Sequence, residues 1–326
     1  MIYNSSATAT MQQPISTREH HPAAWSGLAW GSLGVLAFSF TVPLTRIAVG
    51  EGVPALIAGA GRSVIAAAIA GIVLLIVRPR LPRGRQWLQL GVVAIGIVLG
   101  FPLLTSLALT TTPASHGAVV IAVLPAATAV ASVLRTGERP PVLFWVLAGL
   151  GAVAALGFAA VHGGSLGSLA WPDLLLLGAV VTAALGYAEG GILSRDLGSW
   201  QVVSWALVIS APVTLAITAL TLSEPAVRNQ LTNVSLTGWA AFAYLCAVSM
   251  YLGFFAWYRG LAIGPMTTVS QVQLIQPVIS LIWAALLLGE HISLLTVLGG
   301  LIVIACTAAT VRMRLKPVQI KTRRRP

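Results

Sequence analysis

The sequence predicts an all-α integral membrane protein of ten transmembrane helices, arranged as two inverted five-helix repeats. Three observations lead to this prediction: the composition, the recurrence of long apolar stretches, and a proline and glycine pattern that occurs twice. Of the 326 residues, 57% are hydrophobic and 8% are charged, and the mean hydropathy is +0.90. A chain this apolar needs a lipid bilayer as its solvent, because soluble domains carry far more charge.

The apolar stretches have the length that a membrane crossing requires. About 20 apolar residues form a helix that spans roughly 30 Å of hydrocarbon. Glycine- and proline-containing breaks separate the stretches from one another. The predicted helices are 28–47, 54–77, 87–109, 113–134, 141–161, 172–193, 200–222, 238–259, 265–288 and 293–311.

The positions of the basic residues predict the orientation. An even number of crossings places both termini on one side, and the positive-inside rule makes that side the cytoplasm. Of the 19 lysines and arginines, sixteen then fall inside and three, Arg46, Arg62 and Arg228, fall toward the outside. The sequence thus predicts a multi-pass protein of the cell membrane, with a cytoplasmic tail over 1–25 and a basic one over 312–326 that contacts anionic lipid.

A pattern of prolines and glycines occurs twice. Pro125 and the pair Gly137-Glu138 reappear as Pro277 and Gly289-Glu290 at an offset of 152 residues. Each repeat, 26–162 and 171–311, holds five predicted crossings, so the second enters the membrane with the opposite orientation to the first. Inverted halves supply two nearly equivalent conformations, one open to each side.

These motifs resemble those of the drug/metabolite transporter superfamily, and specifically its EamA-type ten-helix members. The resemblance rests on the 5+5 organisation, on the stretch from Leu107 to Pro113, and on the run that ends in Leu288-Gly289-Glu290. It implies a secondary carrier, often an exporter, with a central cavity lined largely by helices three, four, eight and nine. It also implies a small-molecule substrate, such as an amino acid or a related amphipathic compound.

Two prolines lie in the middle of predicted helices and are expected to kink them. Pro125 and Pro277 each leave the carbonyl four residues earlier, at Ile121 and Gln273, without its helical hydrogen bond. Substrate or water in a cavity could supply the missing donor, and so could a local distortion or a neighbouring hydroxyl.

Polar side chains share one face of the predicted ninth helix. Gln273, Gln276, Ser280 and Trp283 recur at helical spacing, and polar groups in a membrane turn toward the bundle. They either line a cavity and bind substrate or join helices by hydrogen bonds. On the eighth helix, Tyr251 lies near the middle of an aromatic face that is either a wall of the substrate site or ordinary packing.

Glu189 is the one acidic side chain well inside a predicted span, which makes it the candidate for proton coupling. The alternatives are an ion pair with Arg195 and a water-exposed position. Arg62 and His116 lie near the outer side and either recognise substrate or belong to the surface. Glu138 and Glu290 follow glycines, and their carboxylates are expected to favour the start of the next helix.

Several classes of function are disfavoured. We expect neither an enzyme nor a cofactor-dependent protein, because no phosphate-binding glycine loop and no cluster of catalytic side chains occurs. Cys246 and Cys306 lack metal-ligand spacing, so we expect no metal. No nucleic-acid partner is expected, since the basic tail has no accompanying aromatic domain.

The function predicted is secondary active transport by alternating access, with export of small metabolites ahead of the alternatives. Those alternatives are an uptake permease for a sugar or nucleotide-sugar-like solute, and a non-transporting membrane scaffold. Proton coupling and assembly as a homodimer are both left open by the sequence.

Overall fold

The protein is helical throughout the part of the chain that the computed structural model describes, residues 21–137, 141–162, 170–263 and 272–314. Its α-helices are α1 (His21–Ser39), α2 (Thr41–Gly50), α3 (Arg62–Val77), α4 (Arg85–Val93), α5 (Phe101–Ala108), α6 (Ala114–Ile121), α7 (Leu124–Thr136), α8 (Val142–His162), α9 (Trp171–Leu197), α10 (Ser199–Ser223), α11 (Pro225–Thr232), α12 (Leu236–Tyr244), α13 (Gly253–Ile263), α15 (Gln276–Leu288) and α16 (Leu294–Arg314). Three π-helical segments, η1 (Ile57–Gly61), η2 (Ala94–Gly100) and η3 (Leu245–Leu252), and one 3₁₀ turn, η4 (Gln273–Ile275), continue these helices.

Seven helical segments in the described ranges are long and apolar enough to cross a membrane. They are Trp25–Gly50, Ile57–Val77, Arg85–Ala108, Ala114–Arg135, Trp171–Leu197, Ser199–Ser223 and Leu236–Ile263. Three shorter apolar helices, Val142–Ala154, Gln273–Leu288 and Leu294–Cys306, accompany them. The chain is therefore a multi-pass helical membrane protein. The sequence did not predict the short helix α11, which lies in the stretch expected to be a break.

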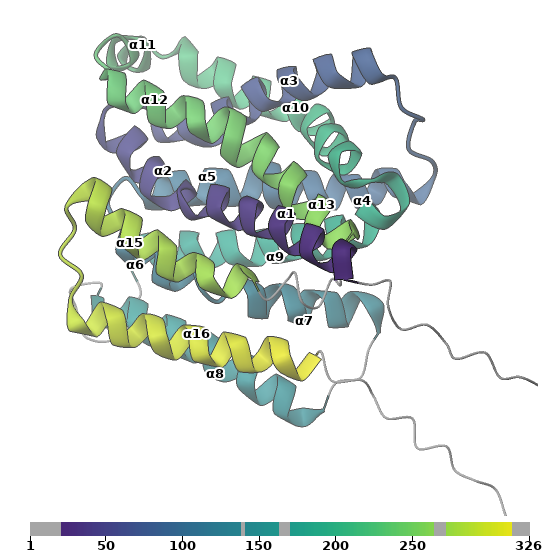
Figure 1. Ribbon diagram of the computed structural model, residues 1–326. Coiled ribbons are helices and arrows are strands. Elements are labelled where there is room, and N and C mark those ends of the chain that lie inside the picture. Colours follow the sequence, from purple (N-terminus) through teal and green to yellow (C-terminus); the bar gives the residue numbers. More distant parts are fainter. Residues whose placement is uncertain (1–20, 138–140, 163–169, 264–271, 315–326) are drawn as a thin grey trace, which may run out of the picture.

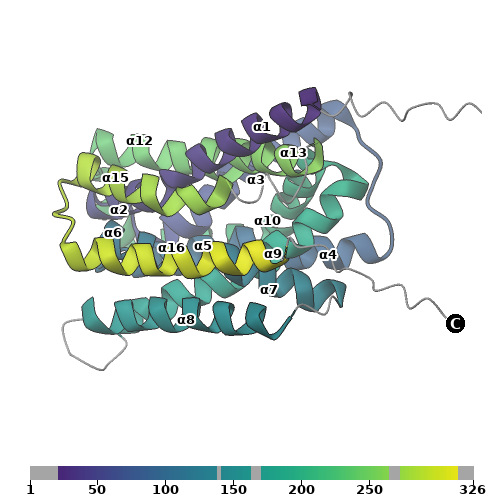
Figure 2. The same cartoon turned by 60° about the horizontal axis from the view of Figure 1, so that its bottom comes forward.

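The helices form a bundle in which segments distant in sequence lie side by side (Figures 1 and 2). Helix α16 runs along α8, α1 packs on α13, and α9 contacts α5, α7 and η2 in the interior. Helix α1 begins and α16 ends at the same end of the bundle, which we call the terminal end. Helix α11 lies at the other end, which we call the opposite end.

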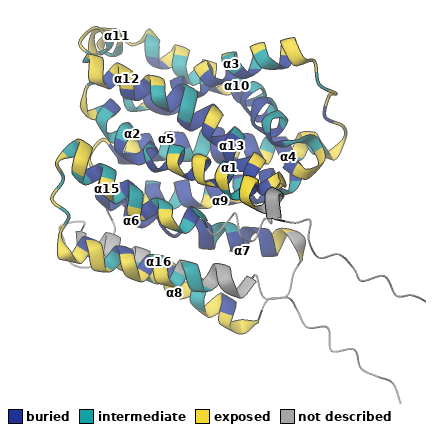
Figure 3. Cartoon of the chain, viewed as in Figure 1, coloured by how far each residue is buried: buried dark blue, intermediate teal, exposed yellow. Residues whose placement is uncertain are grey.

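Exposed residues lie mainly on the outer helices and buried ones toward the inside of the bundle (Figure 3). Leucines such as Leu75, Leu88 and Leu286 are exposed, and the polar residues Arg62, Glu189 and Asp173 are buried. A surface of this kind suits lipid, since a soluble protein rarely exposes a large continuous apolar area.

Close helix packing depends on glycine where α1 crosses α13. A Cβ atom added at Gly260 would lie 2.6 Å from the Gly31 nitrogen and 2.9 Å from the Gly27 oxygen, so the two backbones would have to separate. Small residues let membrane helices approach in this way.

We expect Gly260→Ala to destabilise the protein by about 1–3 kcal/mol, because the added methyl group overpacks a backbone contact. The melting temperature of the purified protein in detergent measures this effect. Gly71→Ala is the matched control, because a Cβ atom at Gly71 has nothing within 4 Å. Equal melting temperatures for the two variants would contradict the expected role of Gly260.

Candidate functional site

Both mid-helix prolines lie where a helix is interrupted. Helix α6 ends at Ile121 and α7 begins at Leu124, one residue before Pro125. The 3₁₀ turn η4 precedes α15, which begins one residue before Pro277. A proline has no N–H to donate to the carbonyl four residues earlier.

A small cavity lies beside these two interruptions. Its volume is about 20 Å³, which is room for about one water molecule. We call it the glutamine cavity. It is lined by Val42, Ala118, Ile121, Leu124, Pro125, Gln273, Gln276, Pro277 and Ser280. The lining includes Ile121 and Gln273, the residues four positions before the two prolines. The Gln273 carbonyl accepts the Gln276 N–H in the 3₁₀ turn, so a local distortion supplies its donor.

A second cavity, also of about 20 Å³, adjoins the first. Val42, Ile121, Leu124 and Gln276 belong to both linings. We call the second one the arginine cavity. Its remaining lining residues are Phe38, Thr41, Arg62, Ile97, Phe101, Pro102, Tyr187, Ser249, Met250 and Phe254. Both halves of the chain contribute to each cavity.

Arg62 is buried inside the bundle and does not reach a surface. The residue is 1% exposed, and its Nε and Nη1 atoms have no hydrogen-bond partner among the described residues. The surface interpretation of this arginine is therefore wrong. The π-helical segment η1 precedes it, and Gly59 in that segment lies close to Leu103 of α5. This close approach sets the arginine deep in the bundle.

The amides of Gln273 and Gln276 line the glutamine cavity and are incompletely hydrogen bonded. Gln273 is 4% exposed, and its Nε2 atom has no partner in the described ranges; nor does Oε1 of Gln276. Buried polar groups are normally satisfied, so each such atom requires an explanation.

Ser280 and Trp283 join helices. The Ser280 hydroxyl donates to the Ser39 carbonyl at 2.9 Å, and the Trp283 indole donates to the Ser39 hydroxyl at 3.0 Å. Trp283 also stacks on Phe40, with ring centroids 4.3 Å apart. Ser280 lines the glutamine cavity as well, whereas Trp283 is in neither lining.

Tyr251 is in neither cavity lining and shares a hydrogen bond of 3.0 Å with Ser204. Its neighbours Ser249, Met250 and Phe254 line the arginine cavity instead. The π-helical segment η3 contains Tyr251, and a π-helix carries more residues in each turn than an α-helix. The residues of this segment that line the arginine cavity therefore do not follow the α-helical spacing from which Tyr251 was predicted.

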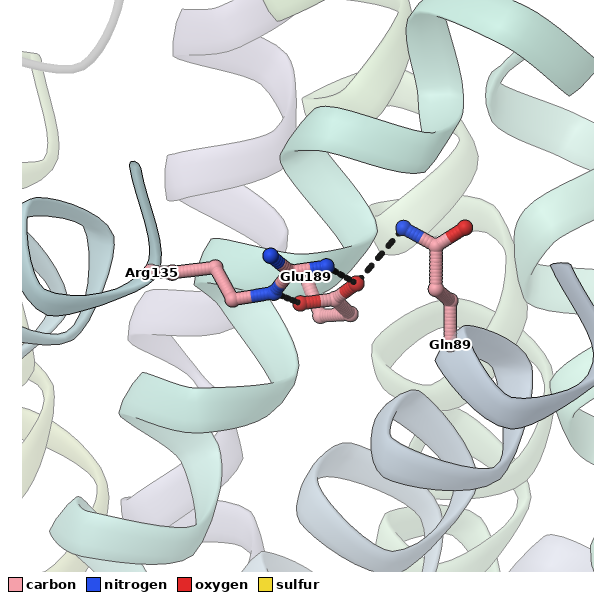
Figure 4. A network of polar contacts seen from close by, with 3 residues as sticks. All are labelled: Gln89, Arg135 and Glu189. Carbon is pink, nitrogen blue, oxygen red and sulfur yellow. Dashed lines mark hydrogen bonds and ion pairs between the residues drawn. The ribbon is translucent and has the colours of Figure 1, made fainter. Parts of the chain in front are cut away.

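Glu189 forms a polar network at the terminal end of the bundle (Figure 4). Arg135 Nε and Nη2 donate to the two carboxylate oxygens at 2.6 and 3.0 Å, and Gln89 Nε2 donates at 2.6 Å. The Glu189 side chain is 6% exposed. Its counter-ion is therefore Arg135 and not Arg195, and the network joins α9 to α7 and α4.

His116 pairs with Asp173, a residue that the sequence analysis missed. The His116 Nε2 and Asp173 Oδ1 atoms are 2.7 Å apart, and both side chains are buried. Asp173 also accepts the Ala170 N–H at 3.0 Å. Glu189 is thus not the one buried acid, and an acid in the first turn after Pro172 was the available signal. Neither cavity includes His116 in its lining.

Glu290 holds a helix far from it in the sequence. Its two carboxylate oxygens accept the N–H groups of Ala114 and Ser115, at 2.7 and 2.8 Å, in the first turn of α6. The expectation that it favours the next helix is therefore wrong, because its partner helix lies 176 residues away. Glu138, its counterpart in the first half, lies outside the described residues.

Two larger hollows have a different character. They measure about 400 and 350 Å³ and are lined almost entirely by apolar side chains, such as Leu75 and Leu81 in one and Ile282 and Leu301 in the other. Lipid chains suit such surfaces. The unpartnered amides and the unpartnered arginine lie in the two central cavities, which are therefore the candidate site.

A central polar site in a helical bundle, with polar links at both ends, is the arrangement expected of a membrane transport protein. Comparison with known proteins identifies the family. The profile of the EamA-like transporter family matches residues 25–160 and again 170–312. The chain therefore belongs to the EamA-like transporter family, and it is a transporter and not an enzyme.

One individual protein supports this assignment, and one solved structure shows the same fold. The chain is 43% identical over 282 residues to a Bacillus subtilis (strain 168) protein named Uncharacterized transporter YdeK, which covers 86% of this chain and 96% of that protein. A solved crystal structure superposes with a TM-score of 0.60 at 19% identity, over 89% of this chain and 99% of that one. The latter similarity shows the fold alone.

Proposed function

We propose that the three shorter apolar helices also cross the membrane, which gives ten crossings in two inverted repeats over 26–162 and 171–311. Three pairs of features at the 152-residue offset support this proposal. The π-helical segments η2 and η3 overlap at that offset, Pro125 corresponds to Pro277, and Gly137 and Gly289 end their helices with φ of 71° and 64°. The two separate matches to the family profile fall on the same halves.

The proposed orientation places the terminal end in the cytoplasm, with both tails, 1–25 and 312–326, on that side. Arg78, Arg85 and Arg135 lie at helix ends there, and the positive-inside rule supports a cytoplasmic location for such clusters. Helix α7 ends at the terminal end and α15 ends at the opposite end, as an inverted repeat requires.

We propose that the protein is a secondary active transporter that exports small metabolites, such as amino acids or related amphipathic compounds, by alternating access. The two adjoining central cavities carry this proposal. Each holds about one water, so the site is contracted in this conformation. The Glu189 network closes the cytoplasmic end, and the Glu290 contact with α6 closes the outer end. Breaking the Glu189 network opens the cytoplasmic end, and breaking the Glu290 contact opens the outer end.

Within this proposal, Gln273, Gln276 and Arg62 bind substrate, because they bring unpartnered polar atoms to the cavities. Ser280 and Trp283 fix the wall that the glutamines occupy. His116 and Tyr251 act one layer further out, through Asp173 and Ser204.

We further propose that Glu189 couples transport to protons. The bidentate pair with Arg135 requires an ionised carboxylate, so proton binding and rupture of the pair are linked. A proton that reaches Glu189 thereby favours opening of the end that the pair closes.

Flux into inside-out membrane vesicles tests the proposal. Vesicles from cells that overproduce the protein are offered labelled amino acids and toxic amphiphiles, with and without an imposed proton gradient. We expect gradient-dependent accumulation several-fold above vesicles without the protein, because export from the cell is uptake in this orientation.

Other outcomes would redirect the assignment. Accumulation that is insensitive to the gradient would contradict coupling while leaving transport intact. Absence of flux for all these compounds would contradict export of this class, and labelled sugars in right-side-out vesicles would then test the uptake alternative.

A further inference from the structure

Arg62 has a positive charge inside the bundle and no counter-ion within the described part of the chain. Two ion pairs there join His116 to Asp173 and Arg135 to Glu189, and neither includes Arg62. No aspartate or glutamate lines either central cavity. A guanidinium cannot easily shed its charge, so an anion is the group that would neutralise it.

The neighbouring polar groups do not satisfy this arginine. The hydroxyls of Thr41 and Ser249, which line the same cavity, hydrogen bond to each other at 2.8 Å. The Arg62 Nε and Nη1 atoms are left as two donors on different edges of one guanidinium. Each can donate to an oxygen of an anion, and a carboxylate accepts such charge-assisted hydrogen bonds.

The arginine cavity also contains an unused acceptor. Gln276 lines it, and its Oε1 atom has no partner among the residues described. Such an oxygen accepts an N–H or O–H group of a ligand. The cavity therefore combines donors for a carboxylate with an acceptor for an adjacent donor group, and apolar walls such as Phe38, Met250 and Phe254 complete it.

We propose that Arg62 is the anion-recognition residue of this protein and that its ligand is a small monocarboxylate with a neighbouring amino or hydroxyl group. The carboxylate binds the Arg62 guanidinium, and the amino or hydroxyl group donates to the Gln276 amide. This inference rests on the proposed function for the location of the site. It adds that the substrate is negatively charged at a carboxylate and that Arg62 recognises this charge. Multiply charged anions are disfavoured, because one arginine provides one charge.

The test compares acids with their own amides. Lactate and lactamide, leucine and leucinamide, and phenylalanine and phenylalaninamide differ within each pair by the carboxylate. Thermal stabilisation of the purified full-length protein in detergent measures binding, and counterflow in proteoliposomes measures transport. We expect the acids to stabilise and exchange, and the amides to do neither.

Variants of Arg62 identify the residue that reads the charge. We expect Arg62→Gln to weaken acid binding about 10- to 100-fold, which corresponds to the loss of hydrogen bonds to a charged group. Arg62→Lys retains the charge without the fixed planar donors of the guanidinium and should keep part of the affinity. Arg228→Gln, at an exposed arginine of α11, is the control and should leave the acid preference unchanged.

The ligand-free melting temperature separates this role from a structural one. A buried charge without a counter-ion destabilises the protein that contains it. Arg62→Met should therefore raise the melting temperature of the ligand-free protein while it abolishes stabilisation by acids. A structural arginine would give the reverse, a lower melting temperature.

The outcomes distinguish this inference from the proposed function. Amides that bind as well as acids, absence of stabilisation by every acid, or an Arg62→Gln variant that still prefers acids would overturn the inference. Exchange of amides or other solutes without a carboxylate would then leave transport standing. Acids that bind without exchange would support the anion site and contradict the proposed transport of these compounds.

Discussion

Replacing Glu189 with glutamine is expected to abolish gradient-driven accumulation in inside-out vesicles while downhill counterflow continues. Glutamine matches the shape of glutamate but carries no charge, so the bidentate pair with Arg135 is lost and the Gln89 contact is weakened. The terminal end, where α4, α7 and α9 meet, would then open without a proton. Accumulation and counterflow measured on the same preparation separate loss of coupling from loss of transport.

Companion variants make this result specific. Asp196→Asn is the matched control, because Asp196 is exposed on the same helix seven residues later. Arg135→Gln leaves the Glu189 carboxylate buried without its cation, so it should lower the melting temperature more than Glu189→Gln does. The double variant should be less destabilised than Arg135→Gln alone, because no unpaired charge is left.

Equal gradient-driven accumulation by wild type and Glu189→Gln would show that Glu189 has no role in coupling.

Replacing Glu290 with glutamine is expected to shift the protein toward the conformation open at the opposite end. The carboxylate accepts two N–H groups from the first turn of α6, where the helix dipole also favours negative charge. Loss of a comparable helix cap costs about 1 kcal/mol, which corresponds to roughly a fivefold change in population.

Cysteine accessibility measures this shift. Ala118 lines the glutamine cavity and is 3% exposed. The thiol of an Ala118→Cys variant should therefore react with a membrane-impermeant maleimide only when the cavity opens to the outside. We expect labelling to be several-fold faster when Glu290→Gln is present. Glu224→Gln, at an exposed acid at the same end, is the control. Unchanged labelling would show that the Glu290 contact does not hold the outer end closed.

Local features of the chain were predicted well because they depend on few neighbours. A segment in a bilayer must satisfy its own backbone hydrogen bonds. An apolar stretch of sufficient length therefore indicates both that the segment is helical and that it lies within the membrane. The predicted span 87–109, for example, corresponds to the described segment Arg85–Ala108. The interruptions at Pro125 and Pro277 likewise follow from the missing N–H of proline.

Side-chain partners were predicted poorly because they depend on how each helix is rotated. Tyr251 was selected by α-helical spacing, but Ser249 and Met250 of the π-helical segment η3 and Phe254 of α13 are the residues that line the arginine cavity. Asp173 was overlooked because its partner, His116, is 57 residues away.

The sequence by itself determined that this protein is a helical membrane transporter of the EamA type, with polar amides on the helix that contains Pro277. Hydrophobic length, proline chemistry and the family motifs are properties of contiguous residues, so they can be read without coordinates. Only the tertiary structure decided that Arg62 is buried beside Gln276, that Glu189 pairs with Arg135, and that Glu290 holds α6. The residues of each of these contacts lie 54 or more positions apart, and helix packing alone brings them together.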